Sequence, residues 1–337
     1  MERELVQNLC RRFPNHPCLK LGPGDDAAIL EVAGTSPEIV VSTDMLTEGV
    51  DYLLQRVSPR KIGRKAMGVN LSDLAAMAAE PLGCVIAVAL PEEPIFPDEN
   101  GVSRKRGLGE LMERLCDGFL ELAETFPIAI AGGDTNIWKG GLVLSLTVIG
   151  RVVGKPLCRR GARAGDAIFV TGNLGGSILG RQFDFLPRIR EMATLRSQVD
   201  LHAGMDISDG LLLDLSRLTQ QSRCGAILDL AAIPISPDAY TLSALQTSSS
   251  PHWDWIPQAF ASRTPLEHAL GDGEDFEILF TVSPEDAWKL EQEKILEIPL
   301  TRIGKITSEP GIFGFSDEKG TFPLKILGFE HSSQGGF

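Results

Sequence analysis

The stretch Ser42-Thr43-Asp44-Met45-Leu46-Thr47-Glu48-Gly49-Val50-Asp51 follows a β-rich run over residues 38–41 and sets a pattern that recurs along the chain. It predicts a buried strand that ends in a glycine-containing turn, with the Asp44 carboxylate between hydroxyl side chains at the strand end. Packing does not explain a charged group there, because burying an uncompensated charge is costly. Oxygen ligands of this kind suit a hard divalent cation. We therefore interpret Asp44 as the anchor of a metal site.

Aspartate recurs beside Gly, Ser, Thr or Asn near the ends of further apolar runs. The four further stretches are Gly24-Asp25-Asp26, Asn70-Leu71-Ser72-Asp73, Gly132-Gly133-Asp134-Thr135 and Asp206-Ile207-Ser208-Asp209-Gly210. Carboxylates at such positions can converge in space even though they are far apart along the chain. Five stretches of this kind indicate a site that gathers divalent cations, which in turn hold a phosphate.

Composition limits the function classes. The 337 residues are 43% hydrophobic, enough for a substantial core, and the length favours two domains. The net charge of −13, without a basic stripe, argues against nucleic acid as a partner. The six cysteines form no C-x-x-C pair, which argues against a zinc ribbon and suits a reducing compartment. No signal core or membrane span is evident, so we expect a cytoplasmic protein without a membrane partner.

The order of predicted elements is that of an α/β protein. Ser58-Pro59 begins a predicted helix that continues at helical spacing through Met77 and contains Asp73. Asp73 could face solvent, or the small residues beside it could let the helix pack on a sheet and carry Asp73 into a site. The other predicted elements are helices over 4–13 and 108–122 and strands over 82–90, 128–131, 142–153 and 167–171. A break at 154–156 predicts domains over 1–154 and 155–331, followed by a disordered tail, 332–337.

Two motifs of the second half have alternative interpretations. The loop Gly172-Asn173-Leu174-Gly175-Gly176-Ser177, at a strand-to-helix junction, could offer its amides to an anion, but it fits neither Walker A nor G-x-G-x-x-G. A P-loop NTPase or a Rossmann dehydrogenase is therefore not indicated. Asp209 could simply cap the apolar helix after it, although capping does not account for Asp206. The arginines over 159–163 suit phosphate oxygens or a solvated turn.

Acids and hydroxyls from several turns suit magnesium and nucleotide phosphates better than zinc, which prefers His and Cys. The five histidines show no ligand spacing. Phosphoryl transfer depends mainly on aligning the reactants and on neutralising oxygen charge, and it does not require a covalent nucleophile. The pattern therefore favours a site that uses ATP and Mg²⁺.

The ordered motifs resemble those of the thiamine-monophosphate kinases, in the aminoimidazole ribonucleotide synthetase-like superfamily. The resemblance spans nearly the whole chain, and the motifs that carry it are Gly24-Asp25-Asp26-Ala27-Ala28, Ser42-Thr43-Asp44-Met45-Leu46, Val69-Asn70-Leu71-Ser72-Asp73-Leu74, Gly132-Gly133-Asp134-Thr135, Met205-Asp206-Ile207-Ser208-Asp209-Gly210 and Gly273-Glu274-Asp275-Phe276-Glu277. It implies a two-domain α/β (α+β) fold in which the N-terminal sheet domain forms a homodimer and the C-terminal domain closes the cleft. It also implies direct in-line transfer of a phosphoryl group from ATP to thiamine monophosphate, assisted by Mg²⁺.

The resemblance also assigns roles to residues of this chain. The implied metal contacts are Asp26, Ser42, Thr43, Asp44, Asp73, Asp134, Asp206 and Asp209, of which Asp44, Asp73 and Asp209 are taken as catalytic. The implied nucleotide contacts are Gly133, Asp134, Arg159 and Ser208. The implied substrate contacts are Asp51, Glu274 and Phe329, with Phe329 as an aromatic platform for a cationic heterocycle.

Three positions depart from the family pattern. Asp51 stands where the family usually has His, Asp272 replaces a glycine, and Gly176 replaces an acid. These departures face the acceptor more than the metals. Two alternatives therefore stay open, namely a superfamily relative that activates another small substrate with ATP and a catalytically silent nucleotide-binding dimer.

Overall fold

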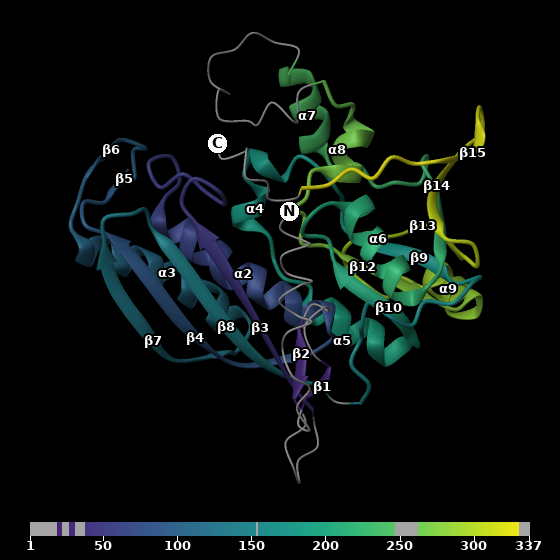
Figure 1. The fold of residues 1–337 in the computed structure, drawn as a ribbon, viewed down its shortest axis with the longest axis horizontal. Coiled ribbons are helices and arrows are strands. Elements are labelled where there is room, and N and C mark those ends of the chain that lie inside the picture. The colour runs from purple at the N-terminus through teal and green to yellow at the C-terminus, as the bar shows by residue number, and fades with distance from the viewer. Residues whose placement is uncertain (1–18, 22–26, 31–37, 153, 247–261, 330–337) are drawn as a thin grey trace.

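Two α/β halves, each built on its own sheet, make up the computed structural model, which describes residues 19–21, 27–30, 38–152, 154–246 and 262–329 (Figure 1). The first half has a six-stranded sheet in the order β1-β2-β3-β8-β4-β7. Its strands are β1 (Leu19–Leu21), β2 (Ala28–Leu30), β3 (Glu38–Thr47), β4 (Glu80–Pro91), β7 (Ala129–Trp138) and β8 (Val143–Val152). A separate hairpin joins β5 (Ile95–Pro97) to β6 (Ser103–Lys105).

Helices α2 (Pro59–Ala76) and α3 (Leu108–Thr125) cover one face of this sheet (Figure 1). As predicted, α2 begins with Pro in its first turn, and the Ser58 side chain accepts the Lys61 N–H. The two helices touch closely because glycines face each other's backbones. A Cβ at Gly63 would lie 2.2 Å from the Leu115 carbonyl oxygen. This close packing fixes α2, the helix that carries Asp73, against β3 and β8.

The second half has a seven-stranded sheet in the order β10-β12-β9-β13-β11-β14-β15. Its strands are β9 (Ala167–Thr171), β10 (Leu201–Asp206), β11 (Gly225–Asp229), β12 (Ile278–Val282), β13 (Leu300–Thr307), β14 (Gly311–Ser316) and β15 (Gly320–Pro323). Its helical segments are η1 (Ser177–Leu179), α4 (Arg181–Asp184), α5 (Ile189–Gln198), α6 (Leu211–Ser222), α7 (Pro237–Gln246), α8 (Pro265–Gly271) and α9 (Pro284–Gln292). Strands β9 and β12 are buried at every position, which places them at the centre of this half.

The two halves pack against each other through apolar side chains. Phe183, Phe185 and Phe276 follow β9 in the chain but belong to the core cluster of the first half. The rings of Phe185 and Phe276 stack with centroids 4.3 Å apart. The segments just before β12 and around α4 are therefore anchored on the core of the first half, and Figure 1 shows α4 between the two halves. The boundary predicted between residues 154 and 155 falls in the connection from β8 to β9 and stays a prediction.

Two sequence predictions about strands need correction. Asp44 lies within β3, which continues to Thr47, and the strand is only partly buried. The motif Gly132-Gly133-Asp134-Thr135 does not form a turn after a strand, because β7 runs through it and pairs in parallel with β4 as far as Trp138. A register shift at Cys84/Val85 and the positive φ of Gly132 (138°) accommodate the glycines in the strand. The predicted helix over 4–13 and the tail over 332–337 lie outside the described residues.

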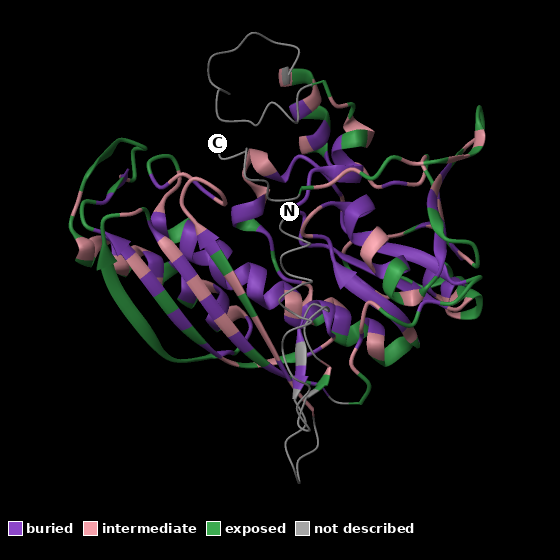
Figure 2. Cartoon of the chain, viewed as in Figure 1, coloured by how far each residue is buried: buried purple, intermediate pink, exposed green. Residues whose placement is uncertain are grey.

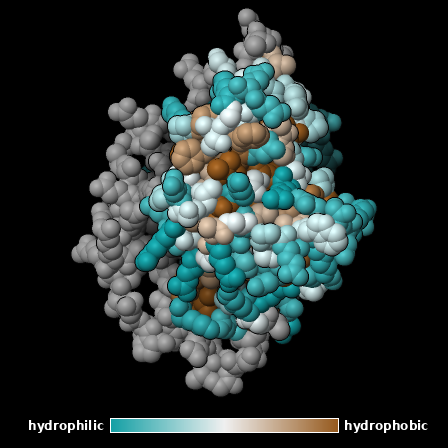
Figure 3. Space-filling view, turned by 90° about the vertical axis from the view of Figure 1, so that its right-hand side faces the viewer, coloured by the Kyte–Doolittle hydropathy of each residue, from teal (hydrophilic) through white to brown (hydrophobic). Residues whose placement is uncertain are grey.

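Exposure differs sharply across the surface. Every residue of β7, the edge strand of the first sheet, is exposed, as its colour in Figure 2 shows. Figure 3 shows the hydropathy of another face, that of the second half, which is mainly hydrophilic with separate hydrophobic patches. None of the helices in the described ranges is both long and apolar enough to cross a membrane.

Candidate active site

Strand alternation divides the first motif between the two faces of the sheet. The Ser42 hydroxyl donates to Asp73 Oδ2 on α2, and the Asp44 amide donates to Asn70 Oδ1 at 3.1 Å. Thr43 points to the other face, where its hydroxyl donates to the Leu146 carbonyl at 2.9 Å. Ser42, Asp44 and Asp73 therefore meet at the interface of β3 and α2. Thr43 could reach this cluster only through its main chain.

Ser72, the residue before Asp73 on α2, points into the second half of the protein. The Ser72 hydroxyl donates to Asp206 Oδ2 at 2.6 Å, and both residues are buried. Asp206 is the last residue of β10. Two adjacent residues of α2 thus contact predicted metal ligands: Ser72 contacts Asp206, and Asp73 contacts Ser42. Four of these predicted ligands, Ser42, Asp44, Asp73 and Asp206, gather around one turn of this helix.

The loop after β10 is shaped by a buried acid. Asp214 Oδ2 accepts the backbone N–H groups of Ser208, Asp209 and Gly210, at 3.1, 3.0 and 3.1 Å. Asp214 Oδ1 and Asp209 Oδ2 both accept from Arg217, at 2.8 and 2.5 Å. Burial, with the Asp209 charge second, raises the pKa of Asp214 to about 7 against the opposing effect of Arg217. The interpretation of Asp209 as a helix cap is wrong, because α6 starts after Gly210 without a side-chain cap.

The main chain of this loop also holds the predicted substrate contacts. The Glu274 N–H donates to the Ser208 carbonyl at 2.7 Å, and the Phe329 N–H donates to the Asp209 carbonyl at 2.9 Å. Gly273 has a positive φ of 79°, and a Cβ there would lie 2.7 Å from Ser208 O, so a side chain does not fit. Three distant segments therefore meet at one place.

A cavity of about 320 Å³, the first cavity, opens where these segments meet β3. It brings together six of the predicted site residues, namely Asp44, Asp51, Ser208, Asp209, Glu274 and Phe329. Asp44 comes from the first half, whereas Asp209 and Glu274 come from the second. An acidic cavity between two halves suits cations and, behind them, phosphates.

Lys65 lines this cavity and carries a positive charge, although only 1% of the residue is exposed. Its ammonium group donates to the Asp51 carbonyl at 2.9 Å, to Gln182 Oε1 at 2.6 Å and to Glu274 Oε1 at 2.5 Å. Desolvation raises the pKa of the Glu274 carboxyl, and Lys65 opposes this effect. Lys65 therefore links α2 to the second half and holds the Glu274 side chain in one position.

Asp51 uses its side chain locally. Its Oδ2 accepts the Thr47 N–H at 2.6 Å, and its own N–H donates back to the Thr47 carbonyl at 3.0 Å. The carboxylate thus closes the turn after β3. Asp51 lines the first cavity, and one of its oxygens is already occupied by the turn; its contact with the substrate stays a prediction.

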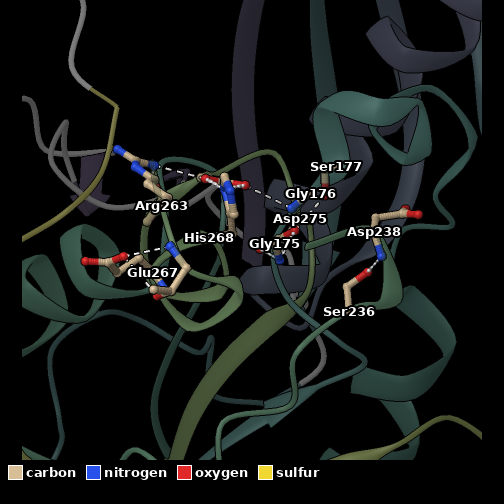
Figure 4. Close-up of polar contacts among 12 residues, drawn as sticks. Gly175, Gly176, Ser177, Ser236, Asp238, Arg263, Glu267, His268 and Asp275 are labelled. Carbon is tan, nitrogen blue, oxygen red and sulfur yellow. Dashed lines mark hydrogen bonds and ion pairs between the residues drawn. The ribbon is translucent and has the colours of Figure 1, made fainter. Parts of the chain in front are cut away.

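The amides of the glycine loop after β9 donate hydrogen bonds to carboxylates of the protein itself (Figure 4). The Gly175 N–H donates to Asp275 at 2.9 Å, the Ser177 hydroxyl donates to Asp275 at 2.6 Å, and the Gly176 N–H donates to Asp272 Oδ2 at 3.0 Å. Burial raises the pKa of Asp275 to about 7 although Arg181 opposes it. The suggestion that these amides meet a ligand anion is therefore wrong.

Two of the departures from the family pattern contact each other in this loop. Asp272 accepts from Gly176, from Arg263 at 2.9 Å and from His268 Nδ1 at 2.8 Å. A Cβ on Gly176, whose φ is 76°, would lie 2.4 Å from the Asp238 carbonyl carbon. Only glycine fits there, and its amide donates to the Asp272 carboxylate. The two departures form a single structural unit beside the first cavity, which Asp272 also lines.

Other predicted residues lie apart from this cluster or were not placed. Gly133 and Asp134 line a separate cavity between β7 and α3, three strand spacings of about 4.8 Å each from β3. Arg159 is close enough to Asp214 for its charge to lower that pKa. Asp26 lies outside the described residues. Within the described part of the chain, no three His, Cys, Asp or Glu side chains converge tightly enough to hold a metal by themselves.

The sequence interpretation missed several residues that shape the site. Asp214, Asn70 and Lys65 were given no role, although Asn70 opens one of the quoted motifs and each of the three bonds to a predicted residue or its backbone. A usable signal existed for Asp214, an acid within an otherwise apolar run that cannot remain buried without donors. Lys65 follows Arg60, Lys61 and Arg64 in the basic first half of α2 and carried no such signal.

Comparison with known proteins identifies the family. Residues 24–152 match the N-terminal domain of the AIR synthase related proteins, and residues 163–316 match their C-terminal domain. The thiamine-monophosphate kinase of Rhodopirellula baltica is 38% identical over 319 residues, 93% of this chain and 92% of that protein. The chain belongs to the thiamine-monophosphate kinase family. The enzyme of this name from Escherichia coli K12 is 32% identical and covers 93% of the chain and 92% of its own length.

Solved structures agree with this family and its fold. The thiamine-monophosphate kinase from Stenotrophomonas maltophilia K279a is 30% identical, with a TM-score of 0.65 over 93% of this chain and 94% of its own. AaThiL complexed with AMPPCP and TMP has a TM-score of 0.75 at 24% identity, covering 98% of this chain and 96% of its own. The predicted two-domain α/β fold and the assignment as a kinase of this family are therefore confirmed.

Proposed function

We propose that the protein transfers the γ-phosphoryl group of ATP to the phosphate of thiamine monophosphate, giving thiamine diphosphate. The observation that carries this proposal is the convergence, in the first cavity, of Asp44 and Asp209 with Asp51, Glu274 and Phe329. The first two suit metal-bound phosphates, and the other three are the substrate contacts that the family implies. The curated relatives carry this activity in their names.

The donor set fits magnesium. Ser42, Asp44, Asp73, Asp206 and Asp209 supply oxygens only, and Mg²⁺ needs few protein carboxylates because it keeps waters and substrate phosphates in its shell. The residues that would hold Mg²⁺ are these five, with Asp26 and the Thr43 main chain as further ligands. Asp134, which lies on β7 away from the first cavity of its own chain, would join such a site only through the dimer proposed below. When bound, Mg²⁺ would neutralise charge on the transferring phosphoryl group.

Hydrogen bonds within the chain would hold the residues that align the phosphoryl donor with the acceptor. Asp214 and Arg217 fix Ser208 and Asp209, Lys65 fixes Glu274, and the Asp209 carbonyl fixes the Phe329 backbone. Donor and acceptor would meet between elements that are already ordered, which is the main requirement of in-line phosphoryl transfer. Gly133, Asp134, Arg159 and Ser208 are proposed to contact the nucleotide.

We include a homodimer formed through the first sheet in this proposal. Strand β7 is exposed along its length, and among the described strands it pairs only with β4, which leaves its other edge open; such edges invite pairing with a second chain. Gly133 and Asp134 lie on this strand, away from the first cavity of their own chain. A second copy against β7 would cover the exposed side chains of Ile137 and Trp138, which are 53% and 45% exposed.

The decisive experiment measures ADP formation by purified protein. Turnover should require both Mg²⁺ and thiamine monophosphate, and mass measurement should find thiamine diphosphate as the product. Thiamine itself, which lacks the acceptor phosphate, serves as the control. Binding of ATP without acceptor-dependent turnover would instead indicate a silent nucleotide-binding protein, and turnover with another small phosphate acceptor would indicate a different superfamily activity.

A further inference from the structure

The residues over 272–277, here called the connecting segment, join α8 to β12 in a backbone form that side chains rarely adopt. Glu274 has a φ of 53° and Phe276 a φ of 49°, both in the left-handed region. This region costs free energy at residues other than glycine, so it persists only where surrounding contacts hold it. The contacts of the connecting segment therefore decide whether it keeps its form.

Side chains of the connecting segment alternate between the two halves of the protein. Glu274 pairs with Lys65 on α2, and Phe276 belongs to the core cluster of the first half. Asp275 and Glu277 bond instead to elements of the second half. The two left-handed residues are thus the ones that face the first half. Relaxing this backbone would turn the Glu274 carboxylate away from the first cavity.

Two arginines hold the acids that face the second half. Arg181, on α4, donates to Asp275 Oδ1 at 2.5 Å and to the Ser177 hydroxyl at 2.8 Å. Arg188, just before α5, donates to both oxygens of Glu277, with Nε 2.7 Å from Oε2 and Nη2 2.5 Å from Oε1. Asp275 and Glu277 are only 2% and 3% exposed, so each needs such a donor to stay charged. Neither arginine lines the first cavity.

The two ion pairs act on the connecting segment from one side. Both arginines lie in the stretch 181–188, and Phe185 of this stretch stacks on Phe276 between the two pairs, with ring centroids 4.3 Å apart. Arg181 also donates to the Asn173 carbonyl at 2.5 Å, which ties the glycine loop after β9 to the same place. The stretch 181–188 thus forms a brace along the connecting segment.

We propose that Arg181 and Arg188 are positioning residues for the acceptor. They hold the connecting segment in its left-handed form and thereby keep the Glu274 carboxylate in the first cavity. This rests on the proposed function, in which Glu274 contacts thiamine monophosphate. Each arginine acts only through Glu274 and touches neither substrate. Loss of either arginine therefore weakens the binding of the acceptor and leaves the binding of ATP unchanged.

The first test separates KM from kcat. Arg181→Ala and Arg188→Ala should each raise the KM for thiamine monophosphate roughly 10-fold, while kcat and the KM for ATP stay within about 2-fold of the wild type. The matched control is Arg302→Ala, which removes a surface arginine that pairs with Glu291 at 3.2 Å, and it should match the wild type. A merely structural role would lower kcat through loss of folded protein and leave KM unchanged. That result would overturn the inference.

A double variant tests whether the effect passes through Glu274. Glu274→Gln should raise the KM for thiamine monophosphate by itself. Adding Arg181→Ala to it should then raise this KM no further, because the group that the arginine positions is already lost. Increments that multiply in the double variant would show that Arg181 acts by another route and would contradict the inference.

Rescue keeps the test decisive where an alanine variant is unstable. Arg181→Lys keeps the charge but not the planar fork, so its KM should lie between those of the wild type and Arg181→Ala. The Arg181 side chain is 24% exposed, which leaves an entry for a small ion. Guanidinium, well below the concentrations that unfold the protein, should lower the KM of Arg181→Ala, and urea, uncharged and of similar shape, should not. Equal effects of the two would count against positioning by this charge.

The outcomes distinguish this inference from the proposed function. A wild type that shows acceptor-dependent turnover, with both arginine variants unchanged in KM, overturns only the positioning role. A wild type without such turnover overturns the proposed function as well. Melting temperature and ATP binding, measured for every variant, establish that the compared proteins are folded.

Discussion

Ser72 Oγ lies 2.6 Å from Asp206 Oδ2, so a helix of the first half is hydrogen-bonded to the end of a strand in the second. The adjacent residue, Asp73, accepts a hydrogen bond from Ser42 on β3. Adjacent positions on α2 thus connect the acids of both halves. A change in the relative position of the halves would separate the acids and end the shared site.

Replacing Asp73 with Asn should abolish most turnover while the fold persists. The amide keeps an oxygen that can accept from Ser42 but loses the charge that attracts Mg²⁺, so we expect kcat to fall roughly 100-fold or more. Steady-state ADP formation at saturating Mg²⁺ measures this effect. Asp317→Asn, at an exposed position in the β14–β15 turn, is the control. Wild-type rates in Asp73→Asn would exclude this residue from the metal site.

Breaking the Lys65–Glu274 pair should cost more than removing both charges. Lys65→Met leaves the Glu274 carboxylate and Gln182 without their donor, and we expect a loss of about 3 kcal/mol in the free energy of unfolding. The double variant with Glu274→Gln should recover part of this loss. Denaturant unfolding of the four proteins forms a double-mutant cycle. Strict additivity would show that the two side chains do not interact energetically.

Asp275 should make stability depend on pH. Its pKa is raised to about 7 by burial, whereas in the unfolded chain it is near the ordinary value of 3.8. Between these values the folded protein binds a proton that the unfolded chain releases. The stabilisation is therefore complete below about pH 4 and is lost as pH rises towards 7, by at most about 1.4 kcal/mol per pH unit.

Asp275→Asn provides the comparison. It removes this titration, so the difference in unfolding free energy between wild type and variant should change between pH 4 and 7 and stay constant above that range. A difference that is flat across the whole range would contradict the raised pKa.

Gly176→Ala should destabilise the protein through a direct clash. The new methyl group would lie 2.4 Å from the Asp238 carbonyl carbon and would disturb the hydrogen bond to Asp272. We expect a loss of roughly 2 to 4 kcal/mol. Gly101 has nearly the same φ, 77°, with open space around it, so Gly101→Ala isolates the backbone cost of about 1 kcal/mol. Similar losses in both variants would show that the contact with Asp238 is unimportant.

A charge on β7 should prevent the proposed dimer. Ile137→Glu places a carboxylate on an exposed position of the edge strand, and analytical ultracentrifugation should then find monomers where the wild type forms dimers. Ile326→Glu introduces the same charge at another partly exposed isoleucine, 40% exposed, and should leave the assembly unchanged. A wild type that is monomeric at micromolar concentration would exclude the dimer.

Local sequence patterns predicted the single helices and strands that carry the site better than they predicted how these elements are arranged in space. The Ser58-Pro59 start and the helical spacing after it correctly predicted α2 with Asp73 inside it. The glycines of the β7 motif suggested a turn, but pairing with β4 extends the strand through them, and pairing between distant segments is invisible in a local pattern. The position of Asp134 follows from the strand order, which no single motif specifies.

The glycine loop is a second case in which a local pattern did not reveal a contact with a distant segment. Its sequence suggested a place for an anion, and the structure supplies one from residues almost a hundred positions later in the chain. Asp214 likewise binds three amides that precede it, although it lies inside an apolar helix. For the glycine loop the amide donors were predictable but their acceptors depended on tertiary structure, whereas Asp214 lies only four to six residues from its three donors.

Because Asp275 and Asp272 already accept hydrogen bonds from the Gly175 and Gly176 amides, these two amides are not available to a free phosphate ion. Inorganic phosphate therefore does not compete for these two amides. Free phosphate would compete with the substrates of the enzyme only at the proposed metal site, and not at this glycine loop.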